Sequence, residues 1–240
     1  IFERFDDIMS EFKIDNQIAV YKTNKKLCEF NDKLKVAPVE YYGHIHAQGE
    51  KVGQSRSRSC IGIVLQDYSK GTGSSTVRVT ANLSPEFFAY ALSRVSIGVE
   101  AFEFVEEKIF GEPDEKGMSK VTKVSIKRAS VGTDGKPRNY PWCVLIENGR
   151  AIKESTQTGG IHAKKGSYQK DNLVFVNIND YDFFKLMQQT SRYINAWELT
   201  YSPKQVREAA RIIAEQNAAQ YEYSLFESGE RCFCIALPCL

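Results

Sequence analysis

The sequence lacks the long apolar runs that would place it in a membrane. No window of its 240 residues approaches 18 uncharged apolar residues, the length that a membrane-spanning helix needs. The first residues, IFERFDDIMSEF, carry acids where a secretory signal carries Lys or Arg followed by an apolar stretch. With 16 glycines and 7 prolines, the chain is neither collagen-like nor of low complexity. We therefore expect a globular, cytoplasmic protein with no membrane partner.

The spacing of the cysteines gives no sign of disulfides or of a metal site. The six cysteines, Cys28 among them, fall at no disulfide-framework spacing, and Cys60 and Cys143 lie in apolar runs. We expect reduced thiols that pack as small hydrophobic groups. Cys232-x-Cys234, with Cys239, has no further Cys or His nearby in the sequence. We therefore expect no bound metal and no cofactor.

Only three histidines are present, which leaves few options for catalysis. His44-x-His46 would lie on one face of a strand, a geometry that can hold a metal. A two-histidine phosphoesterase signature needs His-x-Ser/Thr twice, whereas Ala47 follows His46 and Ala163-Lys164 follows His162. The sequence has no phosphate-binding glycine loop and no serine-nucleophile motif. We predict that the protein is not an enzyme, with a His-dependent phosphoesterase or nuclease as the alternative.

The net charge of +2 hides a strong asymmetry along the chain. Residues 100–116 hold seven acids and two lysines, whereas residues 120–170 hold eleven Lys or Arg and three acids. A basic block beside an acidic one favours a surface that binds a polyanion. An unevenly charged but merely solvated surface is the simpler explanation.

Apolar spacing and capping residues predict helices and strands in a repeating order. Phe2–Phe12 carries an amphipathic helical stripe. Ser84-Pro85, Asn179-Asp180 and Ser202-Pro203 are pairs that open helices. We expect strands at 18–21, 40–47, 60–68 and 76–83 before a helix at 84–95, and strands at 100–110, 121–131, 142–152 and 173–178 before a helix at 180–197.

The two halves of this pattern can be superposed at an offset of 96 residues. The register aligns Val77, Val79, Ser84, Phe87 and Phe88 with Leu173, Phe175, Asp180, Phe183 and Phe184. A repeat of this length favours a duplicated ββββα unit. The expected segments are 1–98 with an N-terminal helix and the first repeat, 99–200 with the second, and 201–240 with a C-terminal helix and tail.

Two copies of four strands and a helix, carried on basic sheets, resemble the Whirly family of single-stranded-DNA-binding proteins. Each half also resembles the DNA-binding domain of the eukaryotic positive cofactor of transcription, which forms the same unit by dimerising. The resemblance covers Ile18 to Trp197 and rests on topology, cap position and charge. It implies an α+β fold in which curved antiparallel sheets hold extended single strands, with helices packed between or behind them.

Binding of single strands without sequence readout needs Lys and Arg along the phosphates and aromatic rings that stack on bases. Both occur together in three expected hairpins. Tyr41 and Tyr42 would point to opposite faces of a strand, so only one can meet a ligand, and Trp142 is either a stacking surface or a core residue. The predicted nucleic-acid-binding residues are Tyr41, Lys51, Arg56, Arg58, Lys127, Arg128, Lys136, Arg138, Tyr140, Trp142, Lys164, Lys165, Tyr168 and Lys170.

The sequence therefore predicts a single-stranded-DNA-binding protein that does not read base sequence. RNA, a duplex or an acidic protein would fit the same basic residues, so an RNA-binding or protein-interaction module is the alternative. Oligomerisation is compatible with each of these functions.

Overall fold

The computed structural model describes residues 14–53 and 55–227. They divide into two units, a larger one formed by 14–34 and 59–195 and a smaller one formed by 35–58 and 196–227. The helix expected at Phe2–Phe12 and the cysteines Cys232, Cys234 and Cys239 lie outside the described residues.

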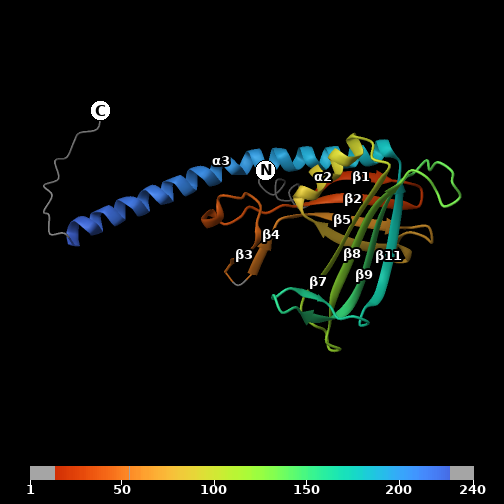
Figure 1. Ribbon diagram of the computed structural model, residues 1–240, viewed down its shortest axis with the longest axis horizontal. Coiled ribbons are helices and arrows are strands. Elements are labelled where there is room, and N and C mark those ends of the chain that lie inside the picture. The colour runs from red at the N-terminus through yellow and green to blue at the C-terminus, as the bar shows by residue number, and fades with distance from the viewer. Residues whose placement is uncertain (1–13, 54, 228–240) are drawn as a thin grey trace, which may run out of the picture. The chain divides into compact units, whose positions relative to one another are not determined.

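The larger unit begins with a four-stranded antiparallel sheet in the order β1-β2-β5-β6, followed by helix α2 (Figure 1). Buried and exposed residues alternate along β6, as in a sheet with one face on a core. Ser84 at the N-cap and Pro85 at the first helical position begin α2 as expected. The bounds are Gln17–Lys22 for β1, Lys26–Lys33 for β2, Cys60–Asp67 for β5, Val77–Leu83 for β6 and Pro85–Ser96 for α2.

A second antiparallel sheet follows, in which β8 lies between β7 and β9, and β11 pairs with the other side of β9. The short β10 pairs with the far end of β9. The fold is thus α+β with antiparallel sheets, and in Figure 1 the strands of the first sheet run across those of the second. The bounds are Ala101–Phe110 for β7, Met118–Ala129 for β8, Trp142–Ser155 for β9, Ile161–Ala163 for β10, Gln169–Ile178 for β11 and Asp180–Glu227 for helix α3.

Buried apolar residues from both sheets and both helices form one core. Phe30 on β2 meets Phe88 on α2 with ring centroids 5.3 Å apart. Trp142 on β9 stacks on Phe183 of α3 at 3.9 Å. Burial of such large apolar side chains is the main favourable term in folding, so each helix is fixed by the sheet that precedes it.

The expected 96-residue register pairs a buried residue with an exposed one. It aligns the fully buried Val79 with Phe175, which is 41 % exposed, and a shift of one residue moves a side chain to the other face of its strand. The N-cap that matches Ser84 is Asn179, whose Oδ1 accepts a hydrogen bond from the Asp182 amide at 2.8 Å. An offset of 95 residues pairs buried positions with buried positions: Val79 with Val174, Leu83 with Ile178, and Phe88 with Phe183.

Residues 40–47 do not form the expected strand. Val39–Tyr41 is a short 3-10 helix (η1), and the amides of Tyr41, Tyr42 and His44 each donate to the carbonyl three residues earlier. The backbone groups that a sheet would use are therefore satisfied locally. Tyr41 and Tyr42 are both exposed, so the expectation that they point to opposite faces of a strand is wrong. A two-stranded ribbon of β3 (Gln48–Val52) and β4 (Ser55–Arg58) follows.

Helix α3 continues through Pro203, so the separate helix expected to open at Ser202-Pro203 is wrong. Proline has no amide to donate to the carbonyl of Leu199, and a long helix that loses this one bond keeps the others on both sides. No helix among the described residues combines the length and the apolarity that crossing a bilayer requires.

On β6 and β11, one of the two edge strands of each sheet, backbone groups at the open edge bond side chains of the opposite sheet. The amide and the carbonyl of Thr80 on β6 each bond the side-chain amide of Asn148 on β9 at 2.9 Å. On the other side, Lys26 of β2 donates to the Phe175 carbonyl of β11 at 2.7 Å. An unpaired strand edge is a template for pairing with another chain, so these contacts both join the sheets and protect their edges.

We predict that Asn148→Ala lowers the free energy of unfolding by about 1–3 kcal/mol, because the Thr80 amide and carbonyl lose their partner. Urea unfolding measures the change. Asn172→Ala, at an exposed position of β11, is the matched control and should cost less than about 0.5 kcal/mol. Equal costs for the two variants would contradict the role given to Asn148.

Candidate nucleic-acid interface

The predicted binding residues fall into three separate groups. The Lys164 amide donates to the carbonyl of Ile152 on β9. Ile152 is ten residues from Trp142 along this strand, so at about 3.4 Å per residue the two positions are ~34 Å apart. The structure thus separates residues that sequence reasoning had grouped. Tyr41, Lys51, Arg56 and Arg58 belong to the smaller unit; Lys127, Arg128, Lys136, Arg138, Tyr140 and Trp142 lie at the start of β9; and Lys164, Lys165, Tyr168 and Lys170 lie near its far end.

The loop between β8 and β9 presents three of the predicted residues to solvent. Gly135, at φ +76°, makes the turn that sequence reasoning expected, and the Arg138 amide donates to the Ser130 carbonyl at 2.8 Å. Lys136 and Arg138 are exposed, and Tyr140 exposes 53 % of its surface. The loop is therefore held at its base while its cations and its ring remain accessible.

Trp142 and Arg128 are structural residues and correct the sequence prediction. Trp142 is fully buried, so it offers no surface for base stacking. Its indole Nε1 donates to Asp180 Oδ1 at 2.7 Å. Arg128 donates to both carboxylate oxygens of Asp180, at 3.0 and 3.1 Å, and its side chain is 11 % exposed. Hydrogen bonds from Arg128, followed by the one from Trp142, hold the pKa of Asp180 below its usual value.

We predict that Asp180→Ala lowers the free energy of unfolding at pH 7 by about 2–3 kcal/mol, because an arginine and a buried indole lose a charged acceptor. Because the folded-state pKa of Asp180 is lowered, this stability is present above the ordinary aspartate pKa of about 3.9 and is lost as the pH falls through the lower folded value. Denaturation at several pH values measures both effects. The control is Asp171→Ala, which breaks an exposed pair with Arg150 and should cost less than about 1 kcal/mol. If the stability difference between Asp180→Ala and the wild type stayed the same at pH 2, the predicted pH dependence would be refuted.

Residues that sequence reasoning missed join the exposed ones on the outer face of the second sheet. Lys127 and Cys143 are cross-strand neighbours that point away from the core. Burial raises the pKa of the Cys143 thiol, while the charges of Lys26, Arg138 and Lys127 act to lower it. Cations from β2, β8 and the β8–β9 loop therefore all act on this thiol. Phe175 lies beside them, with Lys26 Nζ 3.6 Å from its ring centroid. We call Lys26, Lys127, Arg138 and Phe175 near Cys143, together with the exposed Tyr140 of the loop that leads into β9, the Cys143 surface.

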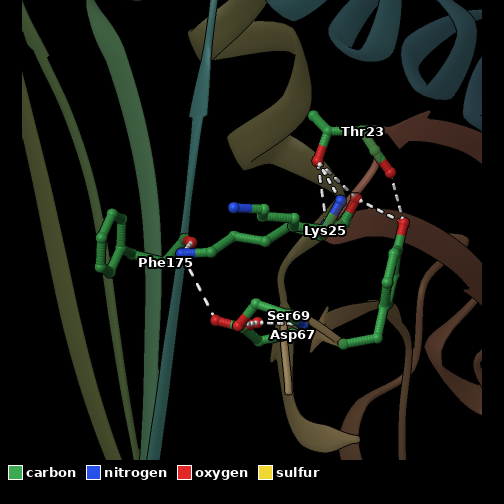
Figure 2. A network of polar contacts seen from close by, with 7 residues as sticks. Thr23, Lys25, Asp67, Ser69 and Phe175 are labelled. Carbon is green, nitrogen blue, oxygen red and sulfur yellow. Dashed lines mark hydrogen bonds and ion pairs between the residues drawn. The ribbon is translucent and has the colours of Figure 1, made fainter. Parts of the chain in front are cut away.

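Turns at Thr23 and at Asp67, whose polar contacts are drawn in Figure 2, hold Lys26 in this position. The hydroxyl of Tyr68 lies 2.6 Å from the Thr23 carbonyl and 3.0 Å from that of Lys26. Asp67 lies 3.6 Å from Lys26 Nζ, and hydrogen bonds from Ser69 lower the pKa of Asp67 more than the charge of Lys26 does. The lysine ammonium is thus fixed beside the Phe175 ring, although Asp67 offsets part of its charge.

Lys127 also has an acidic neighbour within the sheet. Its Nζ lies 2.6 Å from the Glu103 carboxylate on β7, and both side chains are more than half exposed. An exposed pair of this kind contributes little to stability, so a phosphate can replace Glu103 as the partner of Lys127. The acidic block of the sequence therefore lies directly beside the basic one.

At the far end of β9, Lys164 and Lys165 are exposed in the turn before β11. Tyr168 differs from them, because its ring packs closely against Gly149. A Cβ on this glycine would lie 2.8 Å from the tyrosine ring, and Lys123 Nζ lies 3.9 Å from the ring centroid. Burial raises the pKa of Tyr168. The ring is part of the packing of the sheet and presents little face for stacking.

In the smaller unit, the predicted cations lie on the β3–β4 ribbon. Arg58 donates to the Gln48 carbonyl at 3.1 Å. His46 stacks on Trp197 and lies 3.0 Å from Glu198, while His44 lies 3.4 Å from Glu50. The histidines thus have separate acidic partners, and His44 is in a turn rather than on the expected strand. The described residues contain no group of three or more His, Cys, Asp or Glu placed to hold a metal ion.

Comparison with known proteins adds no assignment to this geometry: no family model, no curated protein and no solved structure matches the chain. The interface is therefore judged from its own residues.

Proposed function

We propose that this protein binds single strands of nucleic acid, DNA in the first instance, at the Cys143 surface and without reading base sequence. The observation that carries the proposal is that Lys127 is the cross-strand neighbour of Cys143, while Lys26 lies 3.6 Å from the centroid of the exposed Phe175 ring on β11. Arg138 and Tyr140 are exposed in the loop that leads into β9. Cations contact phosphates, and aromatic faces accept any base.

The exposed rings favour a single strand over the other polyanions. Bases of a duplex are already stacked on each other, so Tyr140 and Phe175 would gain little from a duplex, whereas an unpaired base has a free face. An acidic protein segment would satisfy the cations but has no comparable use for the rings. RNA shares the phosphates and bases of DNA and is the second candidate.

We also propose that the chain is a duplication of one ββββα unit, with its halves related by a pseudo-twofold axis. The buried trio Phe30, Ile63 and Ala81 across the first sheet corresponds to Ile126, Val144 and Val176 across the second. The edge contacts correspond too. Lys26, which is paired with Asp67, bonds β11, and Asn148, which bonds Thr122 at the corresponding position, bonds β6.

A reducing, cytoplasmic setting is part of the same proposal. Cys28 and Cys143 carry free thiols, and burial raises the pKa of both. A thiol with a raised pKa holds little of the reactive thiolate. Both groups are therefore suited to packing in the reduced state.

We predict that labelled oligo-dT binds tightly at low salt and that log K falls with log salt with a slope of about −2, because the three cations Lys26, Lys127 and Arg138 contact phosphates at about −0.7 each. Tyr140→Ala should cost about 1–3 kcal/mol of binding and leave the slope unchanged, since stacking is not ionic. Fluorescence anisotropy at several salt concentrations measures both quantities.

Lys164→Ala with Lys165→Ala, at the far end of β9, is the matched control for an oligomer of about six nucleotides, a length within the range of single-strand sites. It should leave the affinity of this short strand unchanged. Competition by unlabelled single-stranded DNA, RNA and duplex ranks the candidate ligands. Equal competition by duplex, or a slope near zero, would refute the proposal.

A further inference from the structure

The correspondence between the two halves allows their outer faces to be compared row by row. By a row we mean residues that are cross-strand neighbours on one face of a sheet. We compare one row of three residues on the second sheet with the corresponding row on the first. The rows are Lys127, Cys143 and Asn177 on β8, β9 and β11, and Asn31, Gly62 and Asn82 on β2, β5 and β6.

The row on the first sheet is occupied by the chain itself. The side chain of Lys33 lies over Gly62, so close that a Cβ there would come within 2.8 Å of its Cε. Its Nζ lies 3.0 Å from Asn82 Oδ1 and donates to it. From the second sheet, Lys108 donates to the Asn82 carbonyl at 2.8 Å. Both lysines are therefore bonded within the protein at this position.

The neighbouring row on the first sheet carries a carboxylate. Glu29 accepts hydrogen bonds from Asn31 at 2.8 Å and from Gln17 at 2.9 Å. The corresponding residue of the second sheet is Ser125, which has no charge, and Thr80 occupies the position that corresponds to Phe175. The first sheet thus has an acid where the second has a neutral residue, and a hydroxyl where the second has an exposed ring.

We infer that the two outer faces have different functions, and that one chain binds one strand, on the second sheet alone. This inference rests on the function proposed above and adds its stoichiometry and its sidedness. A duplicated unit with two equal faces would bind two strands.

Apart from the bonded Lys33, the exposed cations on the strands of the first sheet are Lys22 and Arg78. The residues between them in their row, Leu27 and Gln66, are not aromatic, so these cations share their row with no ring. The second sheet also carries an acid, Glu103, but this acid is paired with Lys127 at an exposed position, where phosphate can displace it. Cations and an exposed ring therefore occur together on the second sheet, and the occupant that we infer for the Cys143 surface is a single nucleic acid strand.

Native mass spectrometry of the full chain with an excess of ten-nucleotide oligo-dT measures the stoichiometry, and anisotropy measures the affinity of two double variants. Lys127→Ala with Arg138→Ala should lower the affinity about ten- to thirtyfold and flatten the salt slope by about 1.4. The matched control is Lys22→Ala with Arg78→Ala, which removes two exposed cations from the outer face of the first sheet. It has the same change in net charge and should alter the affinity less than about twofold.

One strand per chain, with this contrast between the variants, is the expected result. Two strands per chain, or equal losses in the two variants, would overturn the one-sided inference and leave the proposed function standing. Absence of binding by the unmodified protein would overturn both. As a second readout, bound oligo-dT should slow alkylation of Cys143 and leave that of Cys60 unchanged, as measured by peptide mass spectrometry; equal protection of the two thiols would also overturn the inference.

Discussion

The closed edges of β6 and β11 are the contacts on which the larger unit depends. Each edge strand ends its sheet, and each would expose unpaired amides and carbonyls if the other sheet did not supply partners. Asn148 supplies both a donor and an acceptor to Thr80, and Lys26 supplies a donor to Phe175. The sheets are therefore joined by directional bonds as well as by the apolar core, which fixes the position of each outer face.

The same contact creates the candidate interface. Lys26 closes the β11 edge and thereby places its ammonium against the Phe175 ring, next to cations that belong to the second sheet. Asn148 bonds the β6 edge through a neutral amide, whereas Lys26 bonds the β11 edge through a charged ammonium group. This difference in charge underlies our proposal that the second sheet, and not the first, carries the site for a polyanion.

Local signals predicted much of the fold, and long-range contacts decided the rest. Ser84-Pro85 and alternating apolar residues located α2 and most strands, but the adjacent Phe residues on both helices made the 96-residue register, which pairs buried with exposed positions, look consistent. Strand β2 was missed although Cys28 and Phe30 alternate with polar residues. Exposed loop cations were found from composition. Lys26 and Phe175 were not found from the sequence, because they meet only where the two sheets cross. The burial of Trp142 was not found either, because its partner Asp180 follows it by 38 residues.

Photochemical cross-linking of oligo-dT to the full protein, followed by peptide mass spectrometry, tests the central claim most directly. Binding at the Cys143 surface places bases within reach of Tyr140, Cys143 and Phe175, so cross-links should fall on the peptides that contain these residues and should decrease as salt releases the phosphates. Cross-links confined to the β3–β4 ribbon, or spread evenly over exposed aromatic residues such as Tyr41, would contradict it.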